Sequence, residues 1–88
     1  MMKAMTAERQ ILDEREIIVC GRPLRYCLFQ SERGYGIEVR YTGDDATAFA
    51  GTDLLGAVSA YDKIVRGAVT PCTLADVLAD LSAETAEV

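Results

Sequence analysis

The segment YGIEVRY (residues 35–41) decides the fold, because apolar and polar residues alternate along its whole length. Aromatic and β-branched residues share one side of the extended chain: Tyr35, Ile37, Val39 and Tyr41. The other side carries Gly36, Glu38 and Arg40. Such alternation is typical of an antiparallel strand with one face on the core and the other in water. We therefore predict a half-buried strand whose tyrosine side faces the core.

The chain before and after this segment supplies two more strands. Residues 22–31 also alternate, with one face made of Leu24, Tyr26 and Leu28 and the other of Arg25, Cys27 and Phe29. The intervening Glu32-Arg33-Gly34 predicts a turn, since Gly tolerates a left-handed backbone. A second turn at residues 42–45 precedes a short fourth strand over residues 46–50.

The stretch before Cys20-Gly21 leaves two interpretations open. Its end, Ile17-Ile18-Val19, is strongly β-prone and predicts a strand over about residues 10–19. Alternatively, Thr6 could cap a short helix, so residues 6–16 fit either state. Cys20-Gly21 itself suits a tight hairpin turn.

Helical spacing begins after Gly51-Thr52-Asp53, where Thr52 is the expected N-cap. Apolar residues then recur at helical intervals: Leu54, Leu55, Val58, Tyr61, Ile64 and Val65. Gly67 is placed to end this helix as the residue C′. A second helix is expected from Thr70-Pro71, with an apolar stripe of Leu74, Val77, Leu78 and Leu81.

Strands followed by helices favour an α+β fold over a parallel α/β sheet. We predict a four-stranded antiparallel meander followed by two helices packed on one sheet face. The expected single domain spans residues 6–82, with flexible termini at residues 1–5 and 83–88.

Charge is unevenly distributed along the 88 residues, whose formal net charge is −5. Residues 1–41 carry seven basic and six acidic side chains, whereas residues 42–88 carry two basic and eight acidic ones. The acidic half should repel nucleic acid and anionic membranes. It could attract a basic partner or simply keep a small protein in solution.

The three cysteines, Cys20, Cys27 and Cys72, neither make an even set nor form a C-x-x-C pair. They therefore do not predict a disulfide framework. No signal-peptide apolar run and no membrane-span-length window occurs in the sequence. These features together favour a cytoplasmic location.

No catalytic, cofactor-binding or metal-ligating residue is predicted. Histidine, the commonest general base and metal ligand, is absent, and three scattered cysteines do not make a zinc site. Asp44-Asp45 lacks the spacing of a calcium loop, and the glycines at 51 and 56 are not followed by the Lys of a phosphate loop. Ser59 and Lys63 lie one helical turn apart, but no oxyanion hole or third group accompanies them.

Two sets of residues on the predicted sheet leave an alternative open. Glu38 with Arg25 or Arg40 could form a substrate site, although cross-strand charge pairing explains them as well. Tyrosines on a four-stranded sheet can stack bases. However, Tyr26, Tyr35 and Tyr41 fall on the expected core face and no RNP motif occurs, so we do not expect nucleic-acid binding.

Three segments together resemble a known family: YGIEVRY (35–41), VRGAVTP (65–71) and TLADVLADL (73–81). They are similar to a family of small uncharacterised bacterial domains known mainly from Gram-positive anaerobes. In that family a YGIEI-type strand precedes a helix, a V-x-P turn and a short L-x-D-V-x-x-D helix. The resemblance covers about residues 22–82. It implies a cytoplasmic bacterial protein and carries no activity with it.

Small size and the lack of a catalytic set favour a non-enzymatic protein-interaction or regulatory module. Its partner would be another protein or a second copy of the chain, without membrane, metal or cofactor. A homodimer could pair edge strands or cover the sheet face that carries Phe29. The alternative is small-ligand binding or an enzyme role in a cleft between sheet and helices.

Overall fold

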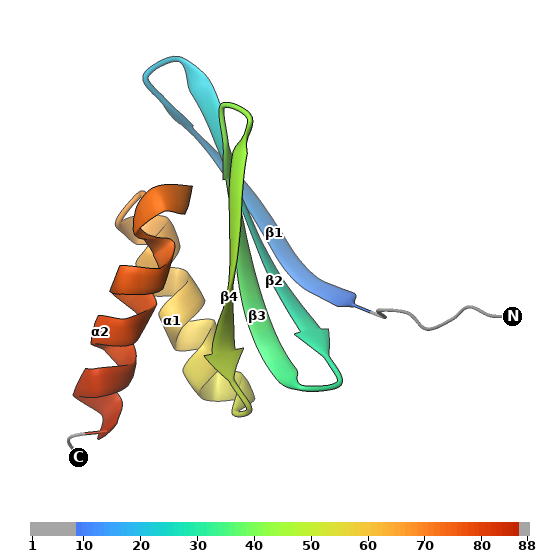
Figure 1. The fold of residues 1–88 in the computed structure, drawn as a ribbon. Helices are drawn as coiled ribbons and strands as arrows, with labels where there is room; N and C mark the ends of the chain where they lie inside the picture. The colour runs from blue at the N-terminus through green and yellow to red at the C-terminus, as the bar shows by residue number, and fades with distance from the viewer. Residues whose placement is uncertain (1–8, 87–88) are drawn as a thin grey trace, which may run out of the picture.

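Four consecutive strands form one antiparallel sheet in the order of the sequence, and two helices pack against one of its faces (Figure 1). The computed structural model describes residues 9–86. The strands are β1 (Gln10–Val19), β2 (Arg22–Ser31), β3 (Gly34–Tyr41) and β4 (Asp44–Gly51). They are followed by α1 (Leu54–Arg66), a 3-10 turn η1 (Pro71–Thr73) and α2 (Leu74–Ala86). The predicted α+β meander is therefore confirmed.

The open question about the first strand is settled for its described part. Residues Gln10–Val19 form β1 and pair with β2, so they are strand and not helix. Thr6, the cap of the alternative helix, lies outside the described residues. Two of the expected hairpin turns use left-handed residue pairs, Cys20-Gly21 with φ of 53° and 76° and Thr42-Gly43 with φ of 49° and 94°. This geometry matches the right-handed twist of the strands that it joins.

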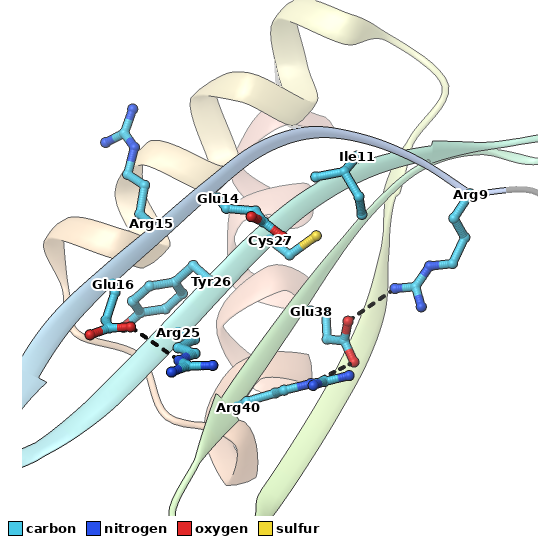
Figure 2. Close-up of a pocket in the computed structure, with 10 residues that line it drawn as sticks. All are labelled: Arg9, Ile11, Glu14, Arg15, Glu16, Arg25, Tyr26, Cys27, Glu38 and Arg40. Carbon is cyan, nitrogen blue, oxygen red and sulfur yellow. Dashed lines mark hydrogen bonds and ion pairs between the residues drawn. The ribbon is translucent and has the colours of Figure 1, made fainter.

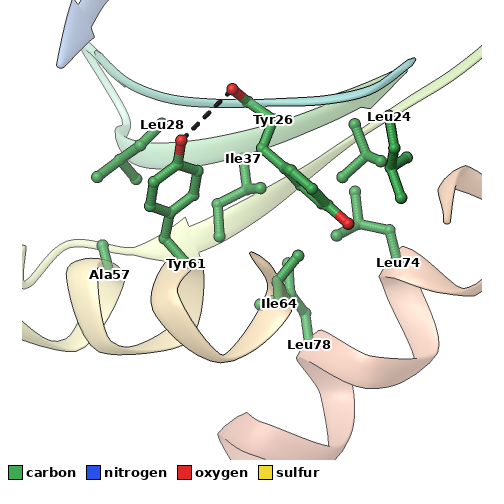
Figure 3. Packing of buried hydrophobic residues seen from close by; sticks show 10 residues of the cluster. Leu24, Tyr26, Leu28, Ile37, Ala57, Tyr61, Ile64, Leu74 and Leu78 are labelled. Carbon is green, nitrogen blue, oxygen red and sulfur yellow. Dashed lines mark hydrogen bonds between the residues drawn. The ribbon is translucent and has the colours of Figure 1, made fainter. Parts of the chain in front are cut away.

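The core lies between the sheet and the two helices (Figure 3). The strands contribute one alternating face, as predicted: Leu24, Tyr26, Leu28, Ile37 and Val39, each at most 3% exposed. The helices contribute Ala57, Tyr61, Ile64, Leu74 and Leu78. Burial of a large apolar side chain stabilises the folded state by about 1.5–3 kcal/mol. The side chains of this layer therefore provide much of the stability of the fold.

Three tyrosine hydroxyls bind backbone carbonyl oxygens across this core. Tyr26 donates to the carbonyl of Val69 at 3.0 Å and ties β2 to the segment between the helices. Tyr41 donates to the carbonyl of Val19 at 2.8 Å. The hydroxyl of Tyr61 on α1 reaches the carbonyl of Tyr26 at 3.4 Å (Figure 3). Each of these three hydroxyls therefore has a hydrogen-bond partner, as is usual for polar groups inside a protein.

The helix ends differ in detail from the sequence prediction. Asp53, not Thr52, caps α1, and its carboxylate accepts the backbone N–H of Gly56 at 2.8 Å. Gly67 follows α1 with φ of −85°, and Ala68 is the residue that turns left-handed, with φ of 52°. Pro71 begins the 3-10 turn η1, and α2 starts only at Leu74.

The apolar residues of α1 do not all face the core. Ala57, Tyr61 and Ile64 are buried, whereas Leu54, Leu55 and Val58 are exposed. Periodicity alone could not separate the two groups, because both recur at helical spacing. No helix among the described residues is long and apolar enough to cross a membrane.

Replacing Tyr26 with Phe should lower the free energy of unfolding by about 1 kcal/mol at pH 7, because the Val69 carbonyl loses its partner. Burial raises the pKa of Tyr26 from its ordinary value to about 12. The unfolded chain therefore loses this proton first, near the ordinary tyrosine pKa of about 10, and the wild type loses stability from there upward. Urea unfolding of both proteins from pH 7 to pH 12 should show the difference shrinking above pH 10. A constant difference would contradict the account.

Candidate functional site

The sheet face opposite the helices is the candidate site, because no other described element covers it. Strand register arranges its side chains in three cross-strand rows. The first is Ile11, Phe29, Gly36 and Phe49, and the second is Glu14, Cys27, Glu38 and Thr47. The third is Glu16, Arg25, Arg40 and Asp45. We call this surface the open face.

A hollow of about 500 Å³ lies on the open face, over β1, β2 and β3 (Figure 2). Its open-face lining mixes charged and uncharged side chains: Arg9, Ile11, Glu14, Glu16, Arg25, Cys27, Glu38 and Arg40. Three arginines thus meet three glutamates over Cys27 and Ile11. In a chain of net charge −5, this surface is locally close to neutral.

Glu38 on β3 is the centre of the charged network (Figure 2). Its Oε1 binds Nη2 of Arg9 at 3.1 Å, and its Oε2 binds Nε of Arg40 at 3.3 Å. The Glu38 side chain is only 14% exposed, which makes it the most enclosed charged side chain of the network. Arg25 instead pairs across the strands with Glu16 at 3.1 Å. The predicted cross-strand pairing of Glu38 with Arg25 or Arg40 is therefore not found: Arg40 binds Glu38 from two residues along the same strand, and Arg25 pairs across the strands with Glu16 instead.

Phe29 is buried although it belongs to the open face. Two neighbours enclose its ring, which is 7% exposed. The guanidinium carbon of Arg9 lies 3.9 Å from the ring centroid, a cation–π contact. Gly36 lies directly opposite on β3, where a Cβ would overlap the ring of Phe29. Arg9, just before β1, thus stacks on Phe29 of β2, which in turn lies against Gly36 of β3; we call these three residues the Phe29 stack.

Cys27 sits between the two glutamates of its row. Burial raises the pKa of its thiol, and the nearby carboxylates of Glu14 and Glu38 raise it further. Arg9 and Arg40 act in the opposite direction but have the smaller effect. A thiol held in its protonated form is a poor nucleophile, so the position does not favour covalent chemistry.

The other sequence candidates do not come together into a site. Ser59 and Lys63 are both exposed on α1, and Asp44 and Asp45 are exposed at the start of β4. The start of α1 already holds the carboxylate of Asp53. Among the side chains of residues 9–80, no three His, Cys, Asp or Glu form a group that could hold a metal ion.

The sequence did not point to Arg9. This residue precedes β1 and belongs to no alternating pattern, yet it joins Phe29 of β2 to Glu38 of β3. The available signal was Gly36 in an otherwise bulky strand, because a glycine inside a strand marks a close approach by another group.

Replacing Gly36 with Ala should lower the free energy of unfolding by about 1–3 kcal/mol, because the new methyl group overlaps the Phe29 ring. Removing the ring first, with Phe29→Ala, should abolish most of that cost. Urea denaturation of the two single variants and the double variant measures this coupling. Additive effects of the two substitutions would refute the stack.

Cys27 should react with iodoacetamide more slowly than Cys20 and Cys72, because both of the latter are exposed and Cys27 is partly buried with a raised pKa. Peptide mass spectrometry after timed labelling at pH 7.5 resolves the three positions. The unfolded chain in urea is the control, where the three rates should converge. Cys27 reacting first in the folded chain would contradict this electrostatic account.

Comparison of the chain with protein-family models, with curated protein sequences and with solved structures found no match. The resemblance to small bacterial domains therefore stays a prediction from the three segments that carry it.

Proposed function

We propose that this protein is a non-enzymatic protein-interaction module of the bacterial cytoplasm, and that it binds its partner on the open face. The observation that carries the proposal is the charged network around Glu38, which fixes arginine side chains on a surface that no described element covers. The cytoplasmic and bacterial parts rest on the cysteine pattern and on the resemblance described above.

The charges of the open face favour recognition over catalysis. Glu16 and Glu38 are bound by arginines, so their carboxylate oxygens are already engaged in ion pairs. Cys27 is held as a thiol. The carboxylates of Glu14 and Glu38 flank this thiol and disfavour the negative charge that a thiolate would carry. The groups that remain are suited to non-covalent contacts.

The composition of the open face fits a protein interface. Arginine and aromatic residues are enriched where binding energy concentrates. Arg25 and Arg40 stand directly opposite each other, with side chains 65% and 62% exposed. Each uses Nε for its own glutamate, which orients the outer guanidinium nitrogens toward a partner. A pre-oriented side chain loses less entropy on binding.

Small-ligand binding is the second candidate, because a hollow of about 500 Å³ falls within the usual size of ligand pockets. It would sit on the open face. The space between sheet and helices, where sequence reasoning placed such a cleft, holds the packed core side chains.

The test is affinity capture from the native cytoplasm with wild type and an Arg25→Ser, Arg40→Ser double variant. The matched control replaces two arginines away from the hollow, Arg22→Ser and Arg33→Ser, with the same change in net charge. We expect the wild type and the control to retain the same protein partner and the open-face variant to lose it. Equal capture by all three would refute the open face, and capture of a metabolite alone would favour the second candidate.

A further inference from the structure

Exposed large hydrophobic side chains gather at one end of the molecule. Seven such residues occur in the described part of the chain, and Ile18 is the only one at the other end of β1. The remaining six belong to the start of β1, the end of β4 and the first turns of α1: Ile11, Leu12, Phe49, Leu54, Leu55 and Val58. In Figure 1 the end of β4 and the start of α1 lie at the bottom of the view, and β1 begins to their right.

Part of this group forms a continuous side of α1. Leu54 and Val58 stand one helical turn apart, and the next turn in the same row is Asp62. Asp62 approaches Arg15 of β1, with Oδ1 3.9 Å from Nη1, so this row faces the β1 side of the sheet. Leu55, 78% exposed, borders the row on its outer side.

Leu12 is the exposed apolar residue of β1 that precedes the contact between β1 and α1 in the sequence. It lies in the irregular part of β1, where the register with β2 shifts between Ile11 and Asp13. Asp13, its neighbour, lies beside the hydroxyl of Tyr61 on α1. We call Leu12, Leu54, Leu55 and Val58 the apolar flank.

Neither the helices nor the hollows account for the apolar flank. α2 packs along β4, which is the edge strand farthest from β1. The hollow on the open face is lined by none of Leu54, Leu55 and Val58. A peptide helix usually binds in an apolar groove. The flank has no such groove, so it does not suit a peptide helix.

We propose that the apolar flank is the twofold contact between two copies of this chain. A twofold interface uses the same patch on both copies. The apolar side of α1 on one copy can therefore pack against the same side of α1 on the other copy, and neither needs a groove. The exposed fractions of the four residues, from 39% to 78%, together equal about two fully exposed aliphatic residues. A standard interface buries about 800 Å² per partner, a little over half of it apolar, so the flank supplies the apolar centre of such a contact and the residues around it supply the rest.

Charge and strand edges favour this contact over the alternatives. Asp62 at the border of the flank is bound by Arg66 at 3.0 Å and approached by Arg15. Dimer formation would therefore leave no carboxylate at this border without a positively charged partner. The free edge of β1 carries four consecutive charged residues at 13–16 next to its irregularity, features that oppose strand pairing between copies. The surface is separate from the hollow of the open face, and the dimer does not rest on the proposed function.

Sedimentation equilibrium between 10 and 500 µM tests the proposal. The wild type should approach twice its mass of 9.6 kDa with rising concentration. Leu55→Glu should weaken the dimer roughly tenfold or more, because two carboxylates would enter an apolar contact. Ile18→Glu is the matched control, since Ile18 is 64% exposed at the other end of β1, and should dimerise as the wild type does.

A folding control, a second variant and the salt dependence complete the experiment. Thermal unfolding must show that Leu55→Glu is folded, and Leu55→Gln serves as a second variant without the added charge. Added salt should strengthen the wild-type dimer, because two chains of net charge −5 repel each other. A wild-type mass of 9.6 kDa at every concentration would overturn the proposal. So would equal weakening by Leu55→Glu and Ile18→Glu, or a monomer whose flank binds another protein instead.

Discussion

The packing of two helices against one face of the sheet is the contact on which the rest of this structure depends. The two α-helices of residues 9–86 both lie on the side of the sheet that carries Leu24, Tyr26, Ile37 and Val39. The alternation of the strands then sends the charged residues to the other side. One-sided cover therefore makes the core and, at the same time, leaves a polar sheet face available for contacts.

The open face is organised rather than merely solvated. Arg9 crosses from the start of β1 to Glu38 on β3 and covers Phe29 on the way, so a single side chain joins three strands. The apolar flank of α1 lies elsewhere, at the margin where the helix layer stops short of β1. The two surfaces differ in chemistry, because the open face combines charged and apolar side chains whereas the flank is apolar, which suits them to different partners.

The fold followed from local patterns, and the candidate site only partly did. Period-two alternation fixed the strands, and the Tyr35 side of β3 indeed faces the core. Phe29 was placed on the correct face, but its burial depends on Arg9 and Gly36, residues distant in sequence. Similarly, Leu55 and Tyr61 both fit the helical spacing of α1, and only tertiary packing decides which is buried. Contacts between side chains of different elements are what single-sequence patterns do not contain.

A charge scan of β2 and β3 tests most directly that the helices cover only one face of the sheet. Each position would be replaced by Asp in turn, and the free energy of unfolding measured by urea denaturation. The account predicts severe losses at Leu24, Tyr26, Leu28, Ile37 and Val39, where the carboxylate would enter the core. It predicts small losses at Arg25 and Arg40, with Phe29 as the open-face position that behaves like the core. Uniform losses along both strands, or a tolerated Asp at Phe29, would contradict it.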